Sequence, residues 1–276
     1  MSYAVVLYSV AYMASVVFSF LWIEKLSHQI SVYLILFSST LLAILVFNVL
    51  NISSCVKIHK LIFSDFKQWA IISFSVAICW CLSFVAASEN AFLFIAIFFL
   101  TNALSAAVYY RHFGKSIAIA LVIAALCFLV PGHLMTNLYS ILSGICGFIY
   151  LLNSVNFSKK NQLSATELLA IRFYPLLFLS VMMCLGLKSS LTVSWTGGDI
   201  SILLALAFFN QILPNFLSQS AAHKLQLKQF SFIISFIPFM AFVGNGIMYD
   251  EWNIILCVLS LIATLALNFD MLFKRR

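Results

Sequence analysis

Long apolar runs alternate with short polar gaps along the whole chain. Ten runs can be distinguished, and most reach the roughly 20 residues that a helix needs to cross about 30 Å of hydrocarbon. We therefore predict an all-α integral membrane protein with ten transmembrane helices, the fifth being the shortest. The runs cover roughly residues 3–23, 29–51, 68–88, 91–110, 116–131, 135–155, 165–187, 199–220, 229–248 and 252–269.

Lys and Arg residues concentrate in every second gap between these runs. Lys and Arg in short loops are retained on the cytoplasmic side, so this alternation predicts cytoplasmic N and C termini and an even number of crossings. Only Lys25 and Lys188 lie on the opposite side. Residues 52–67, 157–163 and 221–228 should be cytoplasmic, and residues 189–198 external. Twelve of the 15 basic residues follow the rule: Lys57, Lys60, Lys67, Arg111, Lys115, Lys159, Lys160, Lys224, Lys228, Lys274, Arg275 and Arg276.

The composition agrees with this class. With 64% hydrophobic and 8% charged residues, the chain has too little polar surface to coat a soluble globule. We predict a single membrane domain over residues 1–276, in which the first run is a retained helix because it lacks a basic leader and an Ala-x-Ala cleavage pattern. The net charge of +7 is dispersed among short loops, so no nucleic-acid partner is expected.

The two halves of the chain show a weak likeness at a shift near 138 residues. Lys25-Leu26-Ser27 aligns with Gln162-Leu163-Ser164, and Tyr110-Arg111-His112-Phe113 aligns with Tyr249-Asp250-Glu251-Trp252. Five helices is an odd number, so a duplicated five-helix unit enters the membrane in the opposite direction the second time. We predict two inverted five-helix repeats, residues 1–132 and 133–276.

Two stretches carry a family resemblance. Leu163-Ser164-Ala165-Thr166-Glu167-Leu168-Leu169-Ala170-Ile171-Arg172-Phe173 resembles the start of helix seven in the EamA-like branch of the drug/metabolite transporter superfamily. The second stretch, Phe236-Ile237-Pro238-Phe239 through Trp252, is similar to that family's helix-nine proline and the acidic turn into helix ten. In the first half, Ile35 stands where Arg172 would match and Phe99 where Pro238 would match.

The resemblance implies a ten-helix carrier whose helices one, three, four, six, eight and nine line a central cavity. Polar and aromatic side chains at depth in these helices are then candidates for substrate binding, although each alone is more often a packing residue. Outside the eighth run, the candidates are Tyr12, Trp80, Asn102 and Asn245.

The eighth run carries the densest set of polar residues at membrane depth. Gln211, Asn215 and Ser218 recur on one helical face, and Asn210 precedes them. Pro214 removes one backbone donor and frees the carbonyl of Asn210. We interpret Asn210, Gln211 and Asn215 as substrate-binding residues; the alternative is a packing kink with amide contacts between helices.

Arg172 lies about two turns into the seventh run from the cytoplasmic side. A long basic side chain at that depth can extend to the interface as an anchor, or it can serve as a gate or an anion-binding residue. Arg172 and Pro214 are therefore assigned together as gate or anchor residues. Gly144, Gly147, Gly244 and Gly246 would allow close helix contacts, for either sliding or static packing.

The leading hypothesis is a secondary transporter, with export the favoured direction, which moves a small polar metabolite such as an amino acid across a bacterial inner (plasma) membrane by alternating access. No catalytic or metal-binding constellation is found, so neither an enzyme nor a cofactor is predicted. Expected partners are the metabolite and membrane lipid, and a homodimer is left open. The alternatives are a non-transporting membrane scaffold or assembly protein, and a flippase of a lipid-linked small molecule.

Overall fold

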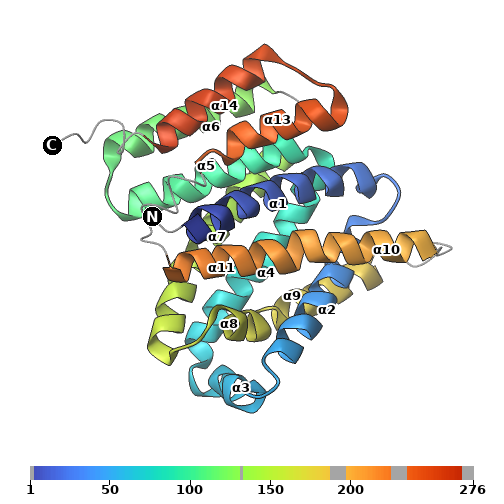
Figure 1. Cartoon of the computed structure of the whole chain (residues 1–276). Coiled ribbons are helices and arrows are strands. Elements are labelled where there is room, and N and C mark those ends of the chain that lie inside the picture. The colour runs from blue at the N-terminus through green and yellow to red at the C-terminus, as the bar shows by residue number, and fades with distance from the viewer. Residues whose placement is uncertain (1–2, 131–132, 187–196, 225–234, 269–276) are drawn as a thin grey trace.

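The computed structural model describes residues 3–130, 133–186, 197–224 and 235–268, all of its regular elements being helices (Figure 1). The basic end Lys274–Arg276, with Lys188 and Lys228 of the charge pattern, lies outside the described residues. The elements are α1 (Tyr3–Ser27), α2 (Val32–Leu50), α3 (Cys55–Ser64), α4 (Phe66–Glu89), α5 (Ala91–Tyr109), α6 (Phe113–Leu129), α7 (Leu134–Asn161), α8 (Ala165–Arg172), α9 (Tyr174–Gly186), α10 (Gly197–Leu206), the π-helix η2 (Ala207–Ile212), α11 (Leu213–Lys224), α13 (Ile237–Tyr249) and α14 (Ile254–Leu267).

Seven helical spans in the described part of the chain are long and apolar enough to cross a membrane. Three further apolar helices, α6, α13 and α14, have 17, 13 and 14 residues in the described segments. Large apolar side chains are exposed on the outside of the bundle, among them Phe128 at 83% and Ile254 at 79% exposure. Such an outer surface suits lipid rather than water. The all-helical multi-pass membrane class is confirmed, while ten crossings and the terminal orientation stay predictions.

The helices form three groups (Figure 1). At one edge, α5, α6, α13 and α14 pack together, and α5, α6 and α14 share a separate apolar core. At the opposite edge, α2 packs on α8 and α9, and α3 packs on α8. Between them, α4 packs on α7, and α1 lies alongside α11. These central helices connect the two edges.

Contacts between loops reveal the alternating direction of the helices. The segment after α3 meets the end of α7 through Lys160 and Asp65, whose Nζ and Oδ2 atoms are 2.6 Å apart. At the other helix ends, Ser27 donates to the carbonyl of Ser88, and the Tyr249 hydroxyl donates to the carbonyl of Leu21 at 3.1 Å. The gaps at residues 52–67 and 157–163 therefore share one end of the bundle, and the gaps after α1, α4 and α13 are grouped together, as the charge pattern requires.

Three elements depart from straight helices joined by loops, and of these only a disturbance near Pro214 was expected from the sequence. The gap at residues 52–67 contains the amphipathic helix α3, whose Ile58 is buried while Val56 and Phe63 are exposed. The seventh run is interrupted between α8 and α9, and the eighth run changes from α-helix to π-helix and back. Both interruptions lie in the second half of the chain.

Glycines bring α5 and α7 very close together. A Cβ atom at Gly144 would lie 2.7 Å from the Thr101 Cβ and 2.8 Å from the Phe98 carbonyl oxygen. At Gly147 it would lie 3.2 Å from the Asn102 amide nitrogen. Close approach without a side chain is how helices associate tightly where apolar burial gives little driving force.

Candidate functional site

The break between α8 and α9 follows from the local sequence. Helix α8 begins with a capping box, in which Ser164 accepts from the backbone of Glu167 and Glu167 accepts from that of Ser164. Ten residues later, Pro175 has no N–H to offer the carbonyl of Ile171. The Trp69 indole from α4 donates to that carbonyl at 2.9 Å. The break is therefore stabilised by a side chain from another helix.

A second donor completes the end of α8. The Asn48 amide of α2 donates to the carbonyl of Ala170 at 3.2 Å. Helix ends within a membrane need such partners because lipid offers none. Arg172, the last residue of α8, is thus held at a fixed position inside the bundle.

The second interruption is the π-helix η2, which ends just before Pro214. The wider π-turn accommodates a residue that lacks an N–H and whose ring crowds the preceding turn. Asn215 donates its side-chain amide to the carbonyl of Gln211 at 2.6 Å. Sequence reasoning expected a disturbance at Pro214, and the disturbance takes the form of a π-turn that carries Asn210 and Gln211.

The two interruptions meet at Arg172. Its Nη2 donates to the side-chain oxygen of Asn215 on α11. The guanidinium also lies over two aromatic rings, 4.7 Å from the centroid of Tyr150 and 4.6 Å from that of Phe173. Gln219 donates to the Tyr150 hydroxyl. We call Tyr150, Arg172, Gln211, Asn215 and Gln219 the Arg172 cluster.

The Arg172 cluster is enclosed by protein. Arg172 and Gln211 have no exposed surface, and Asn210, Asn215 and Gln219 are also buried. The guanidinium is therefore enclosed within the bundle and does not reach its surface. Tight enclosure of a positive charge is costly unless the charge finds partners.

Several polar atoms at this place have no hydrogen-bond partner. They are Nε and Nη1 of Arg172 and the side-chain amide nitrogen and oxygen of both Asn210 and Gln211. An unsatisfied buried donor or acceptor costs about 1 to 3 kcal/mol, and more when it is charged. Such a concentration of unused donors and acceptors is a property of ligand sites, because a bound solute supplies the missing partners.

Of the other predicted site residues, Tyr12 and Trp80 lie on the central helices α1 and α4. The Trp80 ring stacks on Phe20 with centroids 6.0 Å apart and touches Phe84 at 5.8 Å. Trp80 therefore lies at the contact between α1 and α4.

Asn102 and Asn245 lie elsewhere. Asn102 is part of the close α5–α7 contact at Gly147. Asn245 is buried on α13 and donates to Glu251 at 3.4 Å, at the end of the bundle where Tyr249 meets Leu21. The structure thus brings Asn215 into contact with Arg172, places Asn210 and Gln211 on the adjoining η2, and separates Asn102 and Asn245 from them.

Sequence reasoning missed Tyr150 and Pro175. Tyr150 is one aromatic residue among many in an apolar run, and nothing local marks it as the ring under Arg172. Pro175 had a signal, because a proline inside a helical run ends or kinks the helix just before it.

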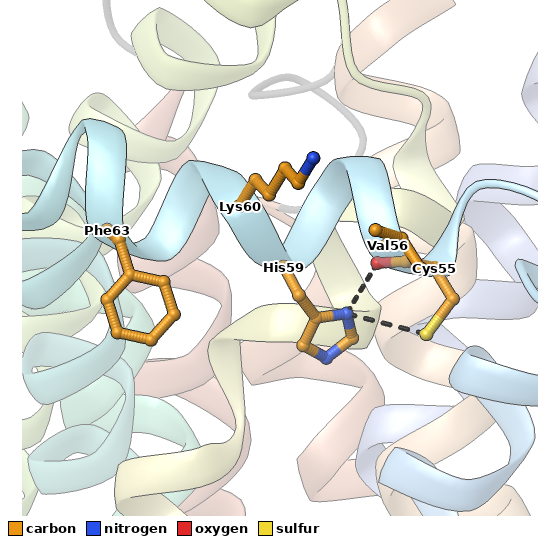
Figure 2. A pocket seen from close by; sticks show the side chains of 5 residues that line it. All are labelled: Cys55, Val56, His59, Lys60 and Phe63. Atoms are coloured by element: carbon orange, nitrogen blue, oxygen red, sulfur yellow. Dashed lines mark hydrogen bonds between the residues drawn. The ribbon is translucent and has the colours of Figure 1, made fainter.

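Two surface hollows lie away from the cluster. Figure 2 shows the first, along one face of α3, lined by Cys55, Val56, His59, Lys60 and Phe63. The His59 ring contacts the Cys55 carbonyl at 2.7 Å and the Tyr174 hydroxyl at 2.6 Å. No group of three metal-ligating side chains occurs among the described residues. We interpret this contact as the link between α3 and α9.

The second hollow is an apolar groove between α5, α6 and α7, lined mainly by aliphatic and aromatic side chains such as Leu104, Ile123 and Phe148. The Arg172 cluster is different in kind, since it combines a cation, amides and aromatic rings within the bundle. This combination can bind and orient a small polar solute. No protein-family model matches the chain, and no curated protein matches it in sequence.

Proposed function

We propose that the chain is a secondary transporter that moves a small polar metabolite across a bacterial inner membrane by alternating access, with export the favoured direction. The observation that carries this proposal is the Arg172 cluster. A buried cation and unpartnered amides are expensive inside a membrane protein, and intramembrane polar groups of this kind mark solute pathways. Amides that served only as contacts between helices would have partners on those helices, whereas those of Asn210 and Gln211 have none.

The pairing of helices supports two related halves. Counting apolar helices in chain order, α1 corresponds to α7, α2 to α8–α9, α4 to α10–η2–α11, α5 to α13 and α6 to α14. The contact of α4 with α7 then has its counterpart in α11 with α1, and α5 with α7 in α13 with α1. Likewise α5–α6 corresponds to α13–α14, and α4–α9 to η2–α2. An inverted repeat predicts such matched pairs, and rocking of one half against the other is the associated transport mechanism.

Transport is tested with purified protein in liposomes. A mixture of small metabolites is supplied outside, and the contents are compared with those of protein-free liposomes by mass spectrometry. We expect at least one small polar metabolite to cross only in the presence of the protein. Failure of every metabolite in a broad panel to cross in either direction would contradict the proposal.

The scaffold alternative is separated by solvent access. Single cysteines at positions 210, 211 and 215, in a background without the seven native cysteines, should react with a membrane-impermeant thiol reagent in one conformation of a transporter. In a static scaffold, side chains as buried as these should not react from either side. Cys at position 36, whose Leu is fully buried in α2, is the matched control.

The flippase alternative is favoured by one observation, the apolar groove between α5, α6 and α7. A lipid-linked solute needs a path for its chain beside the polar site. Replacing Ala124 in this groove by Trp should block a flippase and leave transport of a water-soluble metabolite unchanged. Movement of a fluorescent lipid between leaflets, measured beside metabolite uptake, separates the two.

A further inference from the structure

The substrate class can be narrowed from the charge of the Arg172 cluster. We propose that the transported solute carries a carboxylate, and that this carboxylate pairs with the Arg172 guanidinium at the junction of α7, α8 and α11. This inference rests on the proposed function. It goes beyond a general polar metabolite by stating the charge, the contacting atoms and the side of the site at which the anionic group lies.

The first step is that the protein does not neutralise Arg172 itself. Its three nitrogens have one hydrogen bond in total, to the neutral side chain of Asn215. The carboxylates that the structure describes are engaged elsewhere: Asp65 with Lys160, Glu89 with Thr136, Glu167 in the capping box of α8 and Glu251 with Asn245, while Glu24 and Asp250 lie at the far ends of α1 and α13. None of them forms an ion pair with Arg172.

The second step is that the free atoms match an anion. Nε and Nη1 of Arg172 are donors without partners, in a fully buried group. Charge-assisted hydrogen bonds from guanidinium to carboxylate are about twice as strong as neutral ones. A solute carboxylate would therefore accept from one of the unused donors and offset the buried positive charge.

The third step limits the anion to a small monoanion. Only one cation lies in the cluster, whereas a phosphate ester carries about −1.5 to −2 charges at pH 7. The rings of Tyr150 and Phe173 already occupy space against the guanidinium. Asn210 and Gln211 supply both amide donors and amide acceptors, so they fit an uncharged or amphoteric group such as hydroxyl, amide or amine on the rest of the solute.

Binding is tested without transport, by thermal unfolding of the purified protein in neutral detergent. The probes are lactate, N-acetylglycine, alanine and benzoate, each compared with its own primary amide, which keeps the shape and removes the carboxylate. We expect at least one carboxylate to raise the melting temperature of the wild type more than its amide does. Equal responses to every acid and its amide would overturn the proposal.

Variants assign the response to Arg172. Arg172→Gln should weaken binding of the responding carboxylate about 30-fold or more, while Arg172→Lys retains part of the affinity because it keeps the charge. Lys60→Gln is the matched control, since it removes an equal charge from the exposed face of α3 and should leave binding unchanged. An unchanged carboxylate response in Arg172→Gln would contradict the assignment.

Two further experiments test other anionic ligands and distinguish a failure of transport from a failure of the anion site. Inorganic phosphate and nanodiscs with phosphatidylglycerol in place of phosphatidylcholine test an anionic headgroup, and a stronger Arg172-dependent response to either than to any carboxylate would overturn a small carboxylate. Carboxylate binding without metabolite flux in liposomes would reject transport but retain the anion site. Flux of neutral metabolites alone, with no carboxylate response, would reject the anion site and retain transport.

Discussion

The second helix of each half offers the clearest comparison in the molecule. In the first half, α2 is a continuous helix of 19 residues, and Ile35 is fully buried in its apolar core. In the second half, the matching stretch is broken into α8 and α9, and Arg172 occupies the corresponding place. The third helix repeats this contrast, since α4 runs unbroken for 24 residues whereas η2 interrupts its counterpart.

This difference distinguishes the first half, which acts as a packed support, from the second half, which carries the candidate site. The continuous helices α2 and α4 leave only single oxygen atoms without partners, in Ser39, Thr40, Gln68 and Ser73. Interrupted helices expose backbone groups and place polar side chains at depth, so they need partners such as Trp69 and Asn48, which the first half supplies. The first half therefore supports the second, and the polar groups that it leaves unpartnered, in Arg172, Asn210 and Gln211, are the ones that we assign to the solute.

The largest loss of stability is expected when the first half is made to resemble the second. Ile35→Arg places a charge in a fully enclosed apolar site without any partner, at a cost of about 3 to 5 kcal/mol. We expect little folded protein, measured as the monodisperse fraction after detergent extraction. Ile35→Leu should fold normally. Normal folding of Ile35→Arg would mean that the first half accommodates a buried charge as well as the second half does.

The next largest effect is expected from replacing the side-chain amides of the eighth run, residues 199–220. Both amide atoms of Gln211 lack partners, so Gln211→Leu should keep or raise the melting temperature while apparent solute affinity falls about five- to 150-fold, or 1 to 3 kcal/mol. Asn215 bonds to Arg172 and to the backbone, so Asn215→Leu should also lose stability, by about 0.6 kcal/mol per contact. Unchanged affinity in both variants would remove these residues from the solute site.

Two glycines of the second half contact first-half helices in different ways, which one methyl group can reveal. Gly144→Ala forces Cβ against the backbone of α5, and we expect a net loss of about 1 to 2 kcal/mol. At Gly244, the nearest atoms are the ends of the Leu21 and Val17 side chains, which can move. Gly244→Ala should be near neutral after the helix-propensity gain of about 1 kcal/mol. Melting temperatures measure both, and equal losses would show that the two contacts are equally rigid.

The smallest loss of stability is expected at the break between α8 and α9. Trp69→Phe leaves the Ile171 carbonyl without its donor, at about 1 kcal/mol. Pro175→Ala returns an N–H that can donate to the same carbonyl. The loss caused by Trp69→Phe should therefore shrink when Pro175→Ala is also present, which a double-mutant cycle of melting temperatures measures. Strictly additive effects would show that Trp69 acts only by packing.

Sequence patterns predicted the helical class and the apolar helices well, because periodic burial and short loops are local properties. The density of Asn210, Gln211 and Asn215 was also visible, whereas Arg172 was placed only about two turns into its run. The contact between Arg172 and Asn215 was not visible, because it depends on how α8 and α11 meet across 43 positions of the chain. Helix α3 was not predicted either, because its Lys57 and Lys60 were interpreted only as signals of cytoplasmic orientation.

The central claim is that this protein carries a solute which contacts Arg172. The most direct measurement compares metabolite uptake into liposomes containing wild type, Arg172→Gln and Lys60→Gln, with equal amounts of folded protein in each. We predict uptake of at least one small carboxylate by wild type and by Lys60→Gln, and a reduction of about 30-fold or more in its apparent affinity in Arg172→Gln. Identical uptake by all three preparations, or no uptake by any, would contradict the account.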